Sequence, residues 1–231
     1  SVRRSRAVLL LVLATALPRL IALLHERGTI IAAFQDKGDN FAQTYLASGT
    51  YGFIPGHPSA DTQPLYGWFL IPIYWIFGRT WEAVGLAQIL VAVGTTLVVW
   101  QIGRRWLSPA AGIIGGLLVS FHPYLIWHDI HMNREILDQF LAASTVYLTL
   151  HAAERFTWRR AIPLGAAIGL GVLGNVRLEA LPLVLGAYLL WRSTISKRTL
   201  LACGAIILAT VVVISPWVVR NKVSVGCWAV T

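Results

Sequence analysis

The chain has 231 residues, of which 56% are hydrophobic and only 13% are charged, and its formal net charge is +9 at pH 7. A composition this apolar excludes an ordinary soluble domain and indicates an integral membrane protein. The excess positive charge lies largely in short segments between apolar runs, where it orients helices, so we expect no nucleic-acid partner. Two cysteines, Cys203 and Cys227, are too few for a disulfide framework or a cysteine metal site.

Six apolar runs are about long enough to cross a hydrocarbon core of roughly 30 Å. They cover residues 7–24, 81–100, 109–127, 136–153, 161–190 and 200–219. A single helix through 161–190 would place Arg192 and Lys197 on the same side as the acidic loops, so this run predicts a short hairpin with its tip at residues 175–179. We therefore expect an all-α bundle of about seven transmembrane spans, forming one domain over residues 1–231. Because the chain ends soon after a span, we expect the N-terminal part of a longer protein.

The segments between the runs alternate in charge. Arg4 and Arg6 precede the first run, and further basic clusters follow the second run, the fourth run and the hairpin. The positive-inside rule places these clusters and the N-terminus in the cytoplasm. All ten acidic residues except Glu154 lie on or near the opposite face. Acidic residues contribute little to topology, so their gathering on one side indicates a function there.

The first extracytoplasmic loop is long and covers residues 26–80. A loop of this length is usually functional when it is ordered. Its apolar, aromatic end at residues 65–77 is too short to span the membrane unaided, and it predicts an interfacial or re-entrant helix. Asp36 and Asp39, shortly before Phe41, are the loop carboxylates that we expect to face a cavity and to act as a base. The alternative is that each is simply a turn residue.

The second extracytoplasmic loop is rich in histidine and leads into the fourth apolar run at Glu135. If a helix begins near Asp129, then His128, His131, Glu135 and Asp138 share one face. Two imidazoles and a carboxylate at this spacing could hold a divalent metal cation. The alternative is an amphipathic helix start, where the helix dipole favours acidic residues.

Three arginines lie near the extracytoplasmic boundary: Arg134, Arg177 and Arg220. They could snorkel or pair with acidic residues, or they could bind a phosphate, which suits the planar guanidinium fork. Arg177 lies in the hairpin tip, below the outer interface, where a charge requires a partner or a protein-walled cavity. The glycine pairs Gly165/Gly169 and Gly112/Gly116 predict close helix packing.

Several short motifs occur in a recognisable order on the extracytoplasmic side. They are Asp36 with Gly38-Asp39, Gly49-Thr50-Tyr51-Gly52, Gln63-Pro64-Leu65-Tyr66, Asn133-Arg134-Glu135, Arg177, and Pro216-Trp217-Val218-Val219-Arg220-Asn221. In this respect nearly the whole chain resembles the N-terminal membrane half of a GT-C glycosyltransferase of the aminoarabinose-transferase and protein O-mannosyltransferase type.

The resemblance implies transfer of a sugar from a polyprenyl-phosphate donor to an extracytoplasmic acceptor, in a bacterial inner (plasma) membrane. It implies Asp36, Asp39 and Glu135 as catalytic residues, with Arg134, Arg177 and Arg220 at the lipid phosphate. A divalent cation, held by His128 and His131, is the one cofactor that we consider. The family often has an acidic pair about four residues before an aromatic residue, whereas Asp36 and Asp39 lie five and two residues before Phe41. Which of the two is the base is therefore open.

Two other functions fit the sequence. One is a non-catalytic membrane subunit or scaffold in a larger complex. The other is a transporter or flippase, which would require charges or broken helices near the midplane and an inverted repeat. Only Arg177 approaches that description, and the sequence contains no visible repeat.

Overall fold

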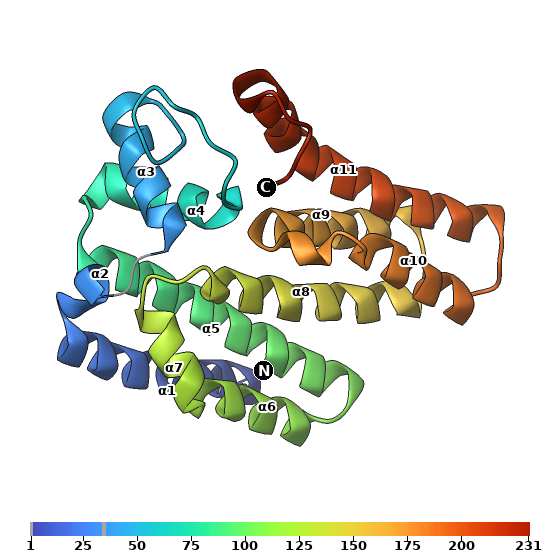
Figure 1. Ribbon diagram of the computed structural model, residues 1–231. Coiled ribbons are helices and arrows are strands. Elements are labelled where there is room, and N and C mark those ends of the chain that lie inside the picture. The colour runs from blue at the N-terminus through green and yellow to red at the C-terminus, as the bar shows by residue number, and fades with distance from the viewer. Residues whose placement is uncertain (1, 34–35) are drawn as a thin grey trace.

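The computed structural model describes residues 2–33 and 36–231, and over these residues the protein is all-α, as expected (Figure 1). The helices are α1 (Val2–Glu26), α2 (Thr29–Ala33), α3 (Lys37–Ser48), α4 (Pro64–Phe77), α5 (Trp81–Trp106), α6 (Pro109–Phe121), α7 (Pro123–Ile130), α8 (Glu135–Glu154), α9 (Trp158–Gly174), the 3-10 helix η1 (Val176–Leu178), α10 (Leu181–Arg192) and α11 (Lys197–Val225). The described part contains no strand, and its one β-bridge joins Ile54 to His57.

Three of these helices, α1, α5 and α11, are long and apolar enough to cross a membrane. The pair α6 and α7 passes the same test as a single span bent by 56°, which gives up to four candidate spans. The remaining helices of the bundle are shorter: α8 has 20 residues, α9 has 17 and α10 has 12. At 1.5 Å per residue, α10 extends only about 18 Å. The protein is thus an integral membrane protein, while the count of seven spans stays a prediction.

Local sequence signals explain where the long helices begin. The hydroxyl of Thr80 accepts a hydrogen bond from Ala83 N and caps α5, and Ser108 caps α6 in the same way, with Pro109 at the first helical position. Ser196 and Thr199 form a reciprocal capping box at the start of α11. Such caps satisfy backbone N–H groups that have no partner inside the helix.

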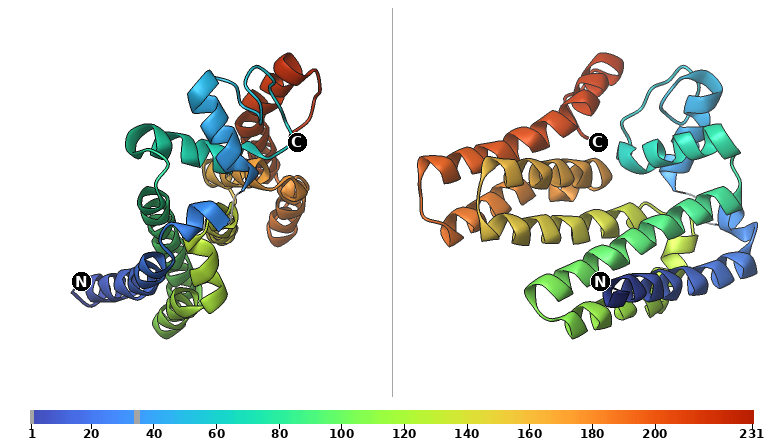
Figure 2. Two further views of the ribbon diagram at one scale, coloured as in Figure 1. Left: turned by 60° about the vertical axis from the view of Figure 1, so that its left-hand side comes forward. Right: turned by 180° about the vertical axis from the view of Figure 1, so that it is seen from behind.

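The helices run side by side, so that the loops gather at two opposite ends of the bundle (Figures 1 and 2). At one end, α3 and α4 lie beside the last turns of α11 and the start of α8. At the other end, the side chains of Arg105 and Arg160 both reach Glu154, and these contacts join α5, α8 and α9. The arrangement separates the acidic loops from the basic loops, as the sequence predicts.

The predicted glycine contacts are confirmed. A Cβ at Gly165 would lie 2.3 Å from the carbonyl oxygen of Ile206, and one at Gly112 would lie 2.7 Å from that of Trp100. Only glycine lets α9 approach α11, and α6 approach α5, at these distances. The hydroxyl of Thr210 also donates to the Gly165 carbonyl across the α9–α11 contact, at 3.0 Å.

The predicted hairpin at 161–190 is present, with α9 and α10 as its arms and η1 at its tip. The segment at 65–77 forms a helix, α4, and Glu135 opens α8; the interfacial or re-entrant position of α4 stays a prediction. The shared face considered for the histidines of the second loop required a helix that begins near Asp129. This condition is not met, because α7 ends at Ile130 and a break of four residues precedes α8.

Candidate functional site

The candidate site lies where the first long loop meets the start of α8 and the hairpin tip. We call it the Asp36 site and define it by Asp36, Gln63, Arg134, Glu135 and Asp138. These residues come from the first loop, from the break before α8, and from the first turn of α8. The loop residues are brought here because α3 and α4 pack on each other and α4 packs on α9.

Asp36 is half-buried and precedes α3 as its N-cap residue, where its Oδ1 accepts a hydrogen bond of 2.8 Å from Gly38 N. Burial raises the pKa of the Asp36 carboxyl above its usual value of 3.8. The Gly38 N–H, the Arg134 charge and the Arg134 N–H oppose this shift, whereas the nearby Asp39 charge adds to it. A carboxylate with a raised pKa is better matched to accepting a proton near neutral pH than an ordinary aspartate.

Arg134 links the loop to α8. Its Nη1 donates a hydrogen bond of 2.7 Å to Gln63 Oε1, directly before α4. Its charge acts on both Asp36 and Asp138. One hydrogen bond uses only part of a guanidinium group with five N–H donors, so Arg134 can bind a further anion.

Asp138 lies one turn into α8, where its Oδ1 is buried and has no hydrogen-bond partner among the described residues. A Cβ at Gly174 would lie 2.9 Å from this oxygen, so the glycine makes room for the carboxylate at the end of α9. A buried carboxylate oxygen without a partner is costly and rare, which singles out this position. Asn175, at the hairpin tip, lies close enough to interact with Asp138.

Glu135 and His128 meet across the helix break, with 3.1 Å between His128 Nδ1 and Glu135 Oε2. The same His128 nitrogen lies 2.7 Å from Asn133 Nδ2. His131 Nδ1 lies 2.6 Å from the Trp127 carbonyl oxygen, and its ring stacks on the Trp127 indole with 4.1 Å between centroids. Because the helix breaks here, the two imidazoles do not share one helical face.

The described residues contain no group of three or more His, Cys, Asp or Glu side chains placed to hold a metal ion. His128 and His131 each face a different local partner. His128 and His131 therefore do not form a metal site with a third ligand among the described residues.

Asp39 is also close to Asp36 but has a different environment. Its side chain is fully buried and accepts hydrogen bonds from Tyr74 Oη at 2.6 Å, Arg79 Nε at 2.9 Å and Arg79 Nη2 at 2.8 Å. Both oxygens are occupied by donors from α4 and the segment after it. This arrangement favours a role for Asp39 in holding α3 against α4.

The three arginines do not form a single cluster. Arg177 is exposed at the hairpin tip, and its side chain makes no hydrogen bond or ion pair with the described residues. Arg220 donates to the carbonyl oxygens of Ser59 and Tyr51 at 2.8 and 2.7 Å, and its guanidinium lies over the Trp217 ring at 4.8 Å. Arg220 therefore ties the first loop to α11, whereas Arg134 lies in the Asp36 site.

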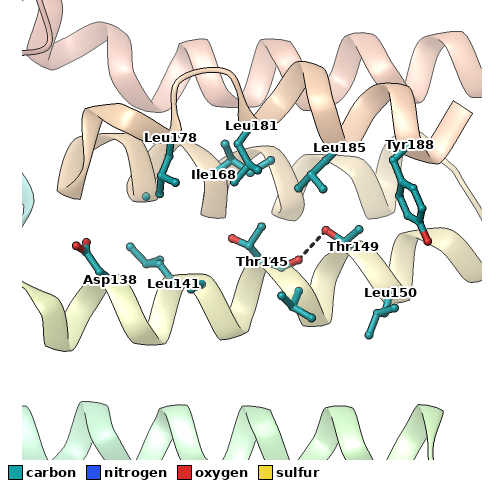
Figure 3. Close-up of a pocket in the computed structure, with 13 residues that line it drawn as sticks. Asp138, Leu141, Thr145, Thr149, Leu150, Ile168, Leu178, Leu181, Leu185 and Tyr188 are labelled. Atoms are coloured by element: carbon teal, nitrogen blue, oxygen red, sulfur yellow. Dashed lines mark hydrogen bonds between the residues drawn. The ribbon is translucent and has the colours of Figure 1, made fainter. Parts of the chain in front are cut away.

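An apolar groove leads away from Asp138 between α8, α9 and α10 (Figure 3). Its volume is about 410 Å³. Along α8 it follows Leu141, Thr145 and Leu150, and Leu181 and Leu185 of α10 face them across the gap. From Asp138 to Leu150 the helix rises by about 18 Å, which is more than half of a hydrocarbon core.

Two arginines that form ion pairs with buried aspartates were not predicted from the sequence. Arg79 pairs with Asp39, as described above. Arg19 is fully buried in α1, where its Nε donates to Asp129 Oδ2 at 2.8 Å and its Nη1 to the Ser120 carbonyl at 2.8 Å. A charge within an apolar run was the available signal for Arg19, since such a residue requires a buried partner. Nothing local in the sequence connects Arg79 with a residue 40 positions earlier.

The apolar helices indicate an integral membrane protein, and its polar site lies at one end of the helix bundle. Residues 57–219 match the family model of dolichyl-phosphate-mannose-protein mannosyltransferases. The chain belongs to this family, and so to the membrane glycosyltransferases of GT-C type. No curated protein and no solved structure matches the chain.

Proposed function

We propose that the protein transfers a sugar from a polyprenyl-phosphate donor to an extracytoplasmic acceptor, with Asp36 as the general base. The observation that carries this proposal is the position of Asp36 and Arg134. The half-buried Asp36 carboxylate and the Arg134 guanidinium lie near each other and near Asp138, and Asp138 lines an apolar groove. A lipid-linked sugar phosphate combines the same chemistry: a long apolar chain, an anionic phosphate and a sugar.

In the proposed reaction, the Asp36 carboxylate accepts the proton of the acceptor hydroxyl. The hydroxyl oxygen attacks the anomeric carbon as the bond from that carbon to the phosphate oxygen breaks. The polyprenyl phosphate leaves with the electrons of this bond and with an additional negative charge. Arg134 stabilises this charge, because a fixed cation in a partly buried site acts most strongly where charge develops. Arg177, at the hairpin tip beside the groove, is a second candidate for binding the phosphate.

Asp36 suits the role of base better than Asp39. A base needs an oxygen that is free to accept a proton from substrate. Both Asp39 oxygens accept hydrogen bonds from the side chains of Tyr74 and Arg79. The donors to the Asp36 carboxylate are backbone N–H groups, those of Gly38 and Arg134, which leaves acceptor capacity for a substrate hydroxyl. We assign Glu135 to orienting the site, since it lies beside His128 at the helix break.

The proposed orientation follows from the charges. The positive-inside rule places the end with Arg105 and Arg160 in the cytoplasm, and the Asp36 site then faces the extracytoplasmic side. In a bacterial cell this side is the outer leaflet of the plasma membrane. The donor's chain would lie in the groove between α8 and α10, with its phosphate near the membrane boundary.

The test is sugar transfer by the purified protein in lipid, with a polyprenyl-phosphate sugar as donor. We expect Asp36→Asn to lower the rate by about 10²–10⁴-fold, the usual contribution of a general base. Asp61→Asn is the matched control, because Asp61 is an exposed loop aspartate whose partner is Lys37. Full activity of the folded Asp36→Asn variant would refute the assignment.

The same purified protein distinguishes a glycosyltransferase from the two other functions, a scaffold in a larger complex and a flippase. If the wild-type protein transfers no sugar but co-purifies stably with a larger membrane complex, the scaffold function gains support. If it moves the donor across proteoliposome membranes without transferring the sugar, a flippase is indicated.

A further inference from the structure

A cavity lined by arginines lies at the opposite end of the bundle from the Asp36 site. Its volume is about 600 Å³, and it lies between the start of α1, the end of α5 and the start of α6. Three arginines, Arg4, Arg104 and Arg105, line it together with Gln101 and Trp100. The transfer chemistry proposed above uses none of these residues.

The positive charge in this cavity is only partly neutralised. Arg105 forms a two-pronged ion pair with Glu154, at 2.9 and 2.7 Å, and Arg160 shares the same carboxylate. In the described part of the chain, neither Arg4 nor Arg104 forms an ion pair with an acidic residue. The cavity therefore keeps two cations without a counter-charge.

The Arg104 guanidinium is held by two contacts, but one of its N–H groups has no hydrogen-bond acceptor among the described residues. Its guanidinium lies over the Trp100 ring at 4.9 Å, and its Nη2 donates to Gln101 Oε1 at 3.1 Å. Its Nε is buried and has no hydrogen-bond partner among the described residues. A buried N–H without an acceptor is unfavourable, so a bound acceptor at this point would be stabilising.

We propose that this cavity binds the phosphate group of an anionic phospholipid. A phosphate oxygen would accept from the Arg104 guanidinium while Arg4 supplies a second positive charge, an arrangement that suits arginine. A lipid is the expected source of the phosphate because the cavity opens at a helix end, beside apolar Ala7 and Ile113. Basic pockets between transmembrane helices at a membrane face commonly bind lipid head groups.

Binding of the purified protein to phosphatidylglycerol, to phosphatidylcholine and to inorganic phosphate tests the proposal, for example by native mass spectrometry. We expect phosphatidylglycerol to bind more tightly than phosphatidylcholine. Arg4→Gln should weaken this binding by about fivefold, since one basic residue near an anionic surface contributes about 1 kcal/mol. Arg104→Gln should weaken it at least as much, and Arg104→Lys less.

Arg192→Gln is the matched control, because Arg192 is an exposed arginine in the last turn of α10 and does not line the cavity. Arg4 is exposed, so its variant reports on binding even if the Arg104 variants fold poorly. Equal binding of both phospholipids, or an equal loss in Arg192→Gln, would overturn the proposal. Tight binding of inorganic phosphate without any preference for phosphatidylglycerol would overturn the lipid assignment and identify free phosphate as the ligand.

Discussion

The clearest prediction concerns the two neighbouring aspartates, Asp36 and Asp39, which should respond to the same substitution in different ways. Asp39→Asn removes a fully buried carboxylate that accepts three hydrogen bonds, two of them from Arg79. Hydrogen bonds to charged groups contribute about 1.5–3 kcal/mol each. The Arg79 side chain is 26% exposed and can regain water, which reduces the net loss.

We therefore expect Asp39→Asn to lower the free energy of unfolding by about 2–3 kcal/mol, less than the sum of the three bonds. For a chain of this size, that loss corresponds to a fall in Tm of about 4–12 °C. Asp36→Asn should change Tm little, because burial disfavours the charged form of the Asp36 carboxyl group, so that removal of this charge costs little stability.

The assay is thermal unfolding of the purified variants in detergent, with sugar transfer measured on the same samples. Asp61→Asn is again the control, because the Asp61–Lys37 pair is more than half exposed on both sides and should contribute little. A wild-type Tm together with a complete loss of transfer in Asp39→Asn would contradict this assignment of the two aspartates. That result would make Asp39 the base and its contacts with Arg79 unimportant for the fold.

Three further outcomes follow from the structure. The base must be ionised to accept a proton, and burial raises the pKa of Asp36, so kcat/KM should fall as the pH drops through a value above 3.8. The Arg134 charge lowers the Asp36 pKa, so Arg134→Gln should move this fall in kcat/KM to higher pH. A move to lower pH would contradict the interaction of Arg134 with Asp36. Arg19→Gln leaves the Asp129 carboxylate buried without its cation, which should lower the free energy of unfolding by about 3–5 kcal/mol. The yield of monodisperse protein in size-exclusion chromatography should then fall strongly. A normal yield would show that the fold does not depend on the Arg19–Asp129 ion pair. Ala142→Trp should fill the groove and raise the KM for long-chain donors. Leu90→Trp, at an exposed position of α5, is the control and should leave this KM unchanged. Equal effects of the two substitutions would argue against the groove as the binding site of the donor's lipid chain.

The sequence predicted the architecture well where a continuous signal exists. Apolar runs mark α1, α5 and α11, because a helix must be apolar over about 20 residues to cross a bilayer. The hairpin of α9 and α10 followed from the side on which Arg192 lies. The break before α8 was missed because it depends on a local turn, in which Asn133 Oδ1 accepts a hydrogen bond from Glu135 N.

The site was predictable in part. The motifs around Asp36 and Arg134 predicted that these residues lie at the same end of the bundle, and the structure brings the two residues together with Asp138. The different environments of Asp36 and Asp39 could not be read from the sequence, since they depend on Arg79, which lies 40 positions away from Asp39. Likewise, the separation of Arg220 from Arg134 follows from contacts between α11 and the first loop.

A structure of the protein with a bound polyprenyl-phosphate sugar, or a non-hydrolysable analogue, would show whether Asp36 and Arg134 act on the lipid-linked donor. We predict a phosphate within hydrogen-bond distance of Arg134, an anomeric carbon facing Asp36, and the lipid chain in the groove between α8 and α10. A phosphate bound far from Arg134, with the sugar turned away from Asp36, would contradict the roles proposed for these two residues.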